Sequence, residues 1–186
     1  MDTKRNHFIP VGMRHKITDK DALVVNTCSG NGTAELGDLH HWVWANPTNT
    51  ALPIEYFDVT AVSVECLWQG TKIQDPTGMT DDNFRCLAGD WRIGKGRRPL
   101  GAYAGPRQPW ITNPGEARRR IYIPSFGQQV RYWLHHGAAA LISQAKGHPG
   151  TVYLRDYDTG QGLDQDGPMS HAWLLSVWLN TGKWPN

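Results

Sequence analysis

The chain has 186 residues, which is enough for one domain with a sizeable buried core and too few for two ordinary domains. Hydrophobic residues make up 39% and charged residues 19%, a balance that excludes a disordered chain or a highly charged tail. The formal net charge is only +2, which argues against a protein devoted to nucleic-acid binding, because such proteins are usually strongly basic.

The first half of the chain is expected to form two short strands and one helix, after an N-terminal extension over residues 1–21. Residues 22–28 have the pattern of a buried strand and lead into a Ser-Gly-Asn-Gly turn. Residues 54–59 alternate apolar and acidic side chains, as a half-exposed strand does. Ser63 is placed to cap a helix over residues 64–73, and one stripe of this helix carries Val64, Leu67, Trp68 and Thr71.

A glycine- and proline-rich insert occupies residues 88–117 and is expected to be mostly irregular. Long ordered loops are more often functional than idle. After the insert, Ser125 and Gln128 have the form of a capping box that begins a second helix. We expect this helix to kink at Gly137 and to continue over residues 138–146.

A short strand over residues 152–154 is expected to run into an acidic loop over residues 155–166. This loop lacks the glycine and the glutamate that an EF-hand needs at fixed positions, which excludes that calcium site. A final helix is expected to begin at Ser170 and to end at Gly182. Together these elements predict an α+β fold, a helix-dominated single domain over residues 1–186 with a few short strands.

The cysteines, Cys28, Cys66 and Cys86, are widely spaced and form no Cys-x-x-Cys pair. The spacing supports neither a disulfide framework nor a cysteine-based zinc site, so no metal and no cofactor are expected. Free thiols are typical of a reducing compartment, which predicts a cytoplasmic protein. No apolar run approaches the ~20 residues that cross a bilayer, and the first residues lack the apolar region of a signal peptide, so no membrane contact is expected.

The charges are unevenly distributed along the chain. Residues 1–91 carry a net charge of −5, residues 92–131 a net charge of +8, and the remaining residues −1. Eight of the nine basic residues in the middle segment are arginines, whose planar guanidinium groups suit bidentate binding of phosphate. The segment therefore predicts an anion-binding surface, although a solvated loop can also carry such a run.

Nine tryptophans either pack the core or border a site for a flat ligand. Trp133, Trp173 and Trp178 lie on apolar helix stripes and are expected in the core. Trp91 and Trp110 lie in the insert, where few apolar neighbours explain them, and we expect them to border a phosphate-lined pocket.

One face of the helix expected after Ser63 carries three polar residues. Glu65, Gln69 and Lys72 are spaced at i, i+4 and i+7, which places them on one side of a helix. A solvated face is the simplest interpretation of such a triplet. The apolar residues around Glu65 instead predict partial burial, and a partly buried carboxylate with a raised pKa can take part in proton transfer.

Residues 63–73, SVECLWQGTKI, resemble the signature helix of the NADAR domain, a family named for its association with NAD and ADP-ribose. That helix reads Thr or Ser, one residue, Glu-His, an aromatic pair, Gln, two residues, Lys, and an aromatic or apolar residue. Cys66 stands here in place of the histidine. Residues 152–158, VYLRDYD, are similar to the family's apolar strand and acidic loop, with Asp158 on its usual aspartate. The resemblance extends over residues 35–179.

Known members of the NADAR family are N-glycosidases, so the resemblance implies a hydrolase that cleaves a bond between ribose C1 and a nitrogen. The implied substrate is ADP-ribosylated guanine in nucleic acid or in a nucleotide, or a phosphoribosylated intermediate of riboflavin synthesis. The implied catalytic residues are Glu65, which would activate water or stabilise the oxocarbenium ion, and Asp158, which would orient the ribose or act as a base.

The resemblance also implies a set of substrate-binding residues. The basic members would hold a pyrophosphate, and one of the tryptophans would stack on a base. The set is Trp68, Gln69, Lys72, Trp91, Arg97, Arg98 and Asp156.

Two other functions stay open at this point. A protein that binds an ADP-ribose-like nucleotide without cleaving it would keep the same binding residues, and Cys66 in place of the family's histidine is compatible with such a sequestering role. A nucleic-acid-binding protein would instead rely on the basic segment, and its affinity would fall steeply with salt.

Overall fold

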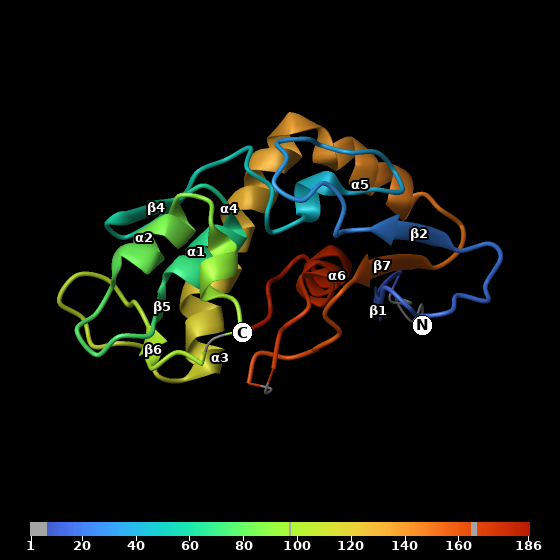
Figure 1. Cartoon of the computed structure of the whole chain (residues 1–186). Coiled ribbons are helices and arrows are strands. Elements are labelled where there is room, and N and C mark those ends of the chain that lie inside the picture. The colour runs from blue at the N-terminus through green and yellow to red at the C-terminus, as the bar shows by residue number, and fades with distance from the viewer. Residues whose placement is uncertain (1–6, 97, 165–166) are drawn as a thin grey trace. The chain divides into compact units, whose positions relative to one another are not determined.

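The computed structural model of the chain describes residues 7–96, 98–164 and 167–186. Packing divides the chain into two compact units, drawn together in Figure 1. Unit 1 contains residues 1–31, 35–46 and 133–186, and unit 2 contains residues 32–34 and 47–132. More of the described residues lie in helices than in strands, and the strands form small separate sheets, which confirms the helix-dominated α+β class.

Unit 1 is built on a parallel sheet of three strands, which Figure 1 shows side by side. The central strand β7 (Val152–Asp156) pairs with β1 (Phe8–Gly12) on one side and with β2 (Leu23–Asn26) on the other. The strands expected at β2 and β7 are confirmed. β1 lies within the segment expected to be an N-terminal extension, so part of that segment belongs to the sheet.

Helix α6 (His171–Thr181) packs against β1 and β7. It begins and ends where the sequence predicts, because the Ser170 hydroxyl accepts a hydrogen bond from the Trp173 amide and Gly182 adopts a left-handed conformation. The side chain of Asn180 in α6 holds the edge of the sheet. Its amide donates to the Phe8 carbonyl oxygen at 2.8 Å, and its carbonyl oxygen accepts from the Phe8 amide at 3.1 Å.

The core of unit 1 contains two tryptophans that are fully buried. Trp42 precedes the short 3-10 helix η1 (Val43–Ala45), Trp44 lies within it, and their ring centroids lie 5.3 Å apart. Trp133 is also buried, as expected, whereas Trp173 and Trp178 of α6 are only half-buried. Full burial was expected for Trp173 and Trp178, and this prediction is wrong, because α6 leaves part of its surface exposed to solvent.

Unit 2 contains two small antiparallel sheets of two strands each, and two short helices pack together there. One sheet is a hairpin of β3 (Ile54–Tyr56) and β4 (Val59–Ala61), and the other pairs β5 (Lys72–Ile73) with the distant β6 (Gly101–Ala102), both antiparallel. The single strand expected over residues 54–59 is thus wrong. The chain reverses at Phe57, which has φ 49°, and this turn divides the segment into two strands.

Helix α1 (Val64–Gly70) begins at the expected cap, where the Ser63 hydroxyl accepts from the Cys66 amide at 3.2 Å. It ends at Gly70 rather than at residue 73, because the chain enters β5 at Lys72. Gly70 lies against helix α2 (Asp81–Leu87), where a Cβ would come within 2.7 Å of Leu87. Only glycine therefore allows the observed packing of α1 on α2.

A helical run begins within the last residues of the insert and is longer than expected. It comprises α3 (Pro114–Ala117), a π-helical stretch η3 (Arg118–Tyr122) and α4 (Ile123–Trp133). The expected capping box at Ser125 is wrong, since Ser125 lies inside the helix and its hydroxyl donates to the Tyr122 carbonyl at 2.9 Å. The true start is Asn113, which caps the helix ahead of a proline.

The expected kink at Gly137 is confirmed. The π-helical stretch η4 (Leu134–Ala138) has non-helical angles at His136 and Gly137, and α5 (Ala139–Lys146) follows it. The insert over residues 88–117 is mostly irregular, as expected, and holds the short 3-10 helix η2 (Trp91–Gly94), β6 and α3. Among the helices that the structure describes, none is both long and apolar enough to cross a membrane.

Candidate functional site

A row of three hydrogen-bonded polar side chains lies along α1 and β5 in unit 2. Gln69 donates through Nε2 to Oε1 of Glu65 at 2.8 Å, and Lys72 donates through Nζ to Oε1 of Gln69 at 2.6 Å. Glu65 and Lys72 are half-buried and Gln69 is buried, so the expected partial burial of Glu65 is confirmed. Lys72 contacts Gln69 as the helical spacing predicts, although Lys72 lies in β5 rather than in the helix.

The position of Lys72 is fixed by its surroundings. Asn83 of α2 donates to the carbonyl oxygens of Gly70 and Lys72, both at 2.8 Å, which holds the backbone between α1 and β5. The Lys72 ammonium lies 5.4 Å from the centre of the Trp68 ring, whose edge packs against Tyr122. Burial lowers the pKa of Lys72, and the negative charge of Glu65 partly opposes that shift.

Cys66 replaces the histidine of the resembling signature and plays no part in this row. It is buried, and burial raises the pKa of its thiol. A buried thiol with a raised pKa is a poor nucleophile, so the chemistry available on this face belongs to Glu65 and its neighbours.

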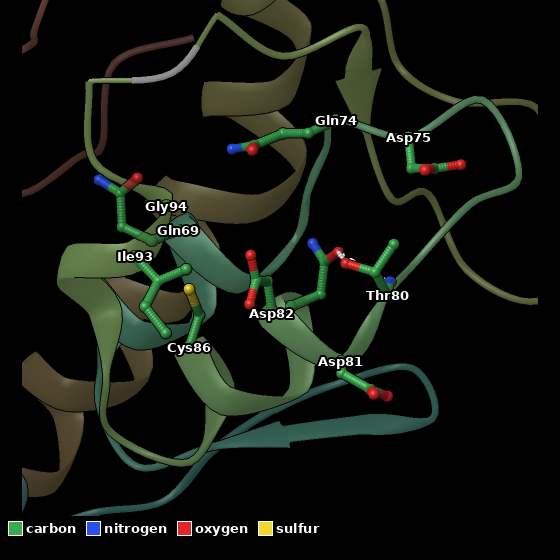
Figure 2. A pocket seen from close by; sticks show the side chains of 10 residues that line it. Gln69, Gln74, Asp75, Thr80, Asp81, Asp82, Cys86, Ile93 and Gly94 are labelled. Carbon is green, nitrogen blue, oxygen red and sulfur yellow. Dashed lines mark hydrogen bonds between the residues drawn. The ribbon is translucent and has the colours of Figure 1, made fainter.

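Gln69 of the row lines an open pocket of about 500 Å³ in unit 2. Figure 2 shows the Gln74 and Asp82 side chains turned toward it, and Asp75 and Asp81 turned away. The lining mixes polar and apolar groups and includes aspartates but no Lys or Arg, which suits hydrogen-bond donors of a ligand better than its phosphates. The lining residues are Gln69, Gln74, Asp75, Thr80, Asp81, Asp82, Asn83, Cys86, Ile93 and Gly94.

Cations gather on η2, the element that contributes Ile93 and Gly94 to the pocket. The Arg92 guanidinium carbon lies 4.6 Å from the centre of the Trp91 ring, and the Lys95 ammonium lies 5.1 Å from it. Both cations are exposed, and Trp91 is half-buried. Neither Arg92 nor Lys95 was among the expected binding residues, although both belong to the basic segment of residues 92–131.

The rest of the basic segment does not form one uniform surface. Arg98 is exposed, and Arg97 lies outside the described residues. Arg118 is buried, which corrects the expectation that the whole run faces an anion. Arg120 is paired with Glu116 at 3.0 Å, one turn away on the same helical run.

The two aspartates of the expected site belong to unit 1, whereas Glu65, Trp68, Gln69, Lys72, Trp91 and Arg98 belong to unit 2. Asp158 is exposed. Asp156 is only 2% exposed, and its carboxylate accepts from the Ser170 hydroxyl at 2.8 Å and from the Ala172 amide at 3.2 Å. A buried carboxylate with protein donors on it serves the fold, and we do not retain Asp156 as a substrate contact.

Asp156 also forms a buried ion pair with His171, whose Nδ1 lies 3.0 Å from Oδ2. The other ring nitrogen, Nε2, lies 3.2 Å from the Thr27 carbonyl oxygen, so both nitrogens face acceptors, as they do in a protonated imidazole. Burial opposes the charge on each partner, but their mutual attraction is stronger. It raises the pKa of His171 well above its usual value and lowers that of Asp156, with help from the Ser170 and Cys28 hydrogen bonds.

His171 and Cys28 were missed by the sequence analysis, because nothing local connects them. The Cys28 thiol donates to Oδ1 of Asp156 at 3.2 Å, across 128 residues of sequence. The sequence shows only that Asp156 follows one predicted strand, that Cys28 ends another, and that His171 lies at the start of a predicted helix. Pairing them requires the order of strands in the sheet.

Residues 41–175 match a family model described as "Family of unknown function (DUF6939)". The match covers well over half of the 186 residues, so the chain belongs to this family. No curated protein matches the chain, and no solved structure matches it.

Proposed function

We propose that this member of the DUF6939 family is an N-glycosidase that removes ADP-ribose from ADP-ribosylated guanine, in a nucleotide or in nucleic acid. The observation that carries the proposal is the hydrogen-bonded row of Glu65, Gln69 and Lys72, whose central member Gln69 lines the pocket of unit 2. The resemblance of residues 63–73 to the NADAR signature helix supplies the substrate class.

The row provides the groups that hydrolysis of a ribosyl bond needs. As the bond between C1 and nitrogen breaks, the nitrogen leaves with the electron pair and positive charge develops on the ribose. A carboxylate close to the ribose stabilises that charge or takes a proton from the attacking water. Gln69 engages Oε1 of Glu65, which orients the carboxylate and leaves Oε2 for this task.

Residues near the row can bind both the base and the phosphates of such a substrate. The amide of Gln74 and the carboxylate of Asp82 can accept hydrogen bonds from N–H groups of a base. Lys72 and the exposed cations Arg92 and Lys95 can hold phosphate oxygens. Asp158 remains a second catalytic candidate, which its own variant tests.

The test uses ADP-ribosylated guanosine and ADP-ribosylated DNA as substrates and measures released ADP-ribose by chromatography. We expect the wild-type protein to release it and Glu65→Gln to lower kcat by about a hundredfold or more, because the variant cannot act as a base. Glu55→Gln removes the same charge from an exposed glutamate on β3 and is expected to keep full activity. An effect of Asp158→Asn on kcat would place that residue in the reaction.

The proposal fails if wild-type protein and Glu65→Gln are equally inert, or equally active, on both substrates across a range of pH. Recovery of intact substrate bound to inert wild-type protein would replace hydrolysis with sequestration. Loss of binding that follows salt concentration alone would instead favour a nucleic-acid-binding function of the basic segment.

A further inference from the structure

A second cluster of reactive side chains lies in unit 1, at the carboxyl edge of the parallel sheet. Asp156 is the last residue of β7, Cys28 follows the end of β2 by two residues, and His171 is the first residue of α6. The carboxyl ends of parallel strands meet at one edge, where ligands commonly bind in open α/β sheets. None of these residues belongs to the site of the proposed function.

The three side chains present a thiol, a carboxylate and an imidazole to one small volume. Sγ of Cys28 lies 3.2 Å from Oδ1 of Asp156, and Nδ1 of His171 lies 3.0 Å from Oδ2. One ligand atom from each residue lies within 4.8 Å of the other two. In the part of the chain that the structure describes, this is the one such group of three or more His, Cys, Asp or Glu residues.

These separations are close to those around a tetrahedral zinc ion. With Zn–S bonds of about 2.3 Å and Zn–N and Zn–O bonds of about 2.0 Å, neighbouring ligand atoms lie about 3.3–3.5 Å apart. The two contacts in the cluster need to lengthen by only a few tenths of an ångström. The two contacts end on different oxygens of Asp156, so one ion held by all three residues requires small shifts of side chains whose ligand atoms already lie within 4.8 Å of one another.

The donor set selects the kind of metal. Calcium and magnesium require oxygen ligands, whereas thiolate and imidazole favour zinc and related transition metals. Three protein ligands leave a fourth position for water or another small ligand, the pattern of zinc sites that carry out chemistry rather than hold a fold.

Neighbouring residues orient the side chains of the cluster through hydrogen bonds. The Thr27 carbonyl oxygen engages Nε2 of His171 at 3.2 Å, which turns Nδ1 toward the other two ligands. The Ser170 hydroxyl fixes the Asp156 carboxylate at 2.8 Å. Asp156 and His171 are buried, while Cys28 is half-exposed and gives the cluster access to solvent.

We propose that Cys28, Asp156 and His171 bind one zinc ion, in a site separate from the Glu65 row. In the absence of metal, the same side chains form the hydrogen-bonded ion pair described above. No metal was expected from the sequence, because its widely spaced cysteines form no Cys-x-x-Cys pair. Only the sheet order β1-β7-β2 and the packing of α6 bring Cys28, Asp156 and His171 together.

The test titrates metal-stripped, full-length protein with Co²⁺, a coloured probe for zinc sites, and then with Zn²⁺. We expect one equivalent of Co²⁺ to produce the near-ultraviolet charge-transfer absorption of a thiolate ligand, and Zn²⁺ to abolish it. Cys28→Ser should remove this absorption and weaken Zn²⁺ binding at least about tenfold, since it replaces the soft ligand with a poor one. Cys86→Ser, which alters a buried thiol of unit 2, should retain both.

A second measurement uses wild-type protein only and does not depend on the folding of any variant. Alkylation of each cysteine is followed by mass spectrometry with and without Zn²⁺, and we expect Zn²⁺ to slow alkylation of Cys28 at least tenfold relative to Cys66 and Cys86. The proposal is overturned if one equivalent of Co²⁺ gives no thiolate absorption, if Cys28→Ser leaves it intact, or if Zn²⁺ does not protect Cys28. Any of these results would reduce the cluster to a buried ion pair.

Discussion

Replacing Asp156 with asparagine tests the buried ion pair of unit 1 most directly. Asparagine has nearly the same shape and can still accept the hydrogen bonds from the Ser170 hydroxyl and the Ala172 amide. It cannot balance the charge of His171, whose Nδ1 lies 3.0 Å away. The substitution therefore removes the charge and leaves most of the local packing in place.

The expected cost follows from the burial of both partners. Asp156 is 2% exposed and His171 is 7% exposed, so neither charge is well solvated after the other is lost. Breaking a buried pair by removing one partner costs about 3–5 kcal/mol, a large part of the 5–15 kcal/mol that stabilises typical proteins. For a chain of this size, we expect the melting temperature to fall by roughly 6–20 °C.

The cost should depend on pH in a way that the two pKa shifts dictate. His171 has a raised pKa in the folded protein, so its contribution is complete below its ordinary value of about 6.5 and is lost as the pH rises through the folded value. Asp156 has a lowered pKa, so its contribution is present above about pH 4 and is lost as the pH falls through the folded value. The pair contributes fully between about pH 4 and pH 6.5.

Urea unfolding of metal-free wild-type protein and Asp156→Asn, followed by circular dichroism from pH 3 to pH 10, measures this difference. We expect the gap between the two free energies of unfolding to be widest within that window and to narrow on both sides. Asp21→Asn, an exposed aspartate of the same unit, is the matched control and should change stability by less than about 0.5 kcal/mol. A gap that stays constant across the whole pH range would refute the ionic interpretation.

Three further substitutions test local packing, two of them in unit 2 (Gly70 and Asn83) and one in unit 1 (Gly147). Gly70→Ala should destabilise the protein by about 1–3 kcal/mol in urea unfolding, because its Cβ would lie 2.7 Å from Leu87 of α2. Gly147→Ala should instead stabilise it by about 0.4–1 kcal/mol, since a Cβ there has no neighbour nearer than 3.5 Å and the backbone is compatible with alanine. Asn83→Ala should cost about 1–3 kcal/mol by the same measurement, because the carbonyl oxygens of Gly70 and Lys72 lose their donor, and equal stability would show that water replaces it.

The elements that the sequence predicts correctly are those with local signals at both ends. Helix α6 is an example, because Ser170 supplies the cap at its start and Gly182 the left-handed residue at its end. The kink at Gly137 is another, since glycine tolerates its φ of 111°. Signals of this kind depend on residues a few positions apart and need no knowledge of the rest of the fold.

The elements that the sequence misses depend on distant partners or on competing signals. β1 contains proline and glycine and becomes a strand because β7, more than 140 residues later, pairs with it. Ser125 carries a good capping signal but lies in a helix that Asn113 and Pro114 have already started. Arg118 belongs to a basic run and is nevertheless buried, because the helical period turns it inward.

The residues of the candidate sites also divide into those with local sequence signals and those brought together only by the fold. Glu65 and Gln69 were predictable because they lie one turn apart on a capped helix, and the resemblance of residues 63–73 adds a chemical role. Cys28 and His171 were not, since 143 residues separate them along the chain. Pairings of this kind arise from the order of strands, which local periodicity does not encode.

The two hydrogen bonds between the Asn180 side chain and the Phe8 backbone affect the order in which the units fold during synthesis. Residues 47–132 of unit 2 are contiguous and can fold as they leave the ribosome. β1 is made first but has no partner until β7 emerges, and its outer edge is not secured until Asn180 follows. The first strand of unit 1 therefore stays unpaired while most of the chain is synthesised. Unit 1 is complete only after α6 has been synthesised.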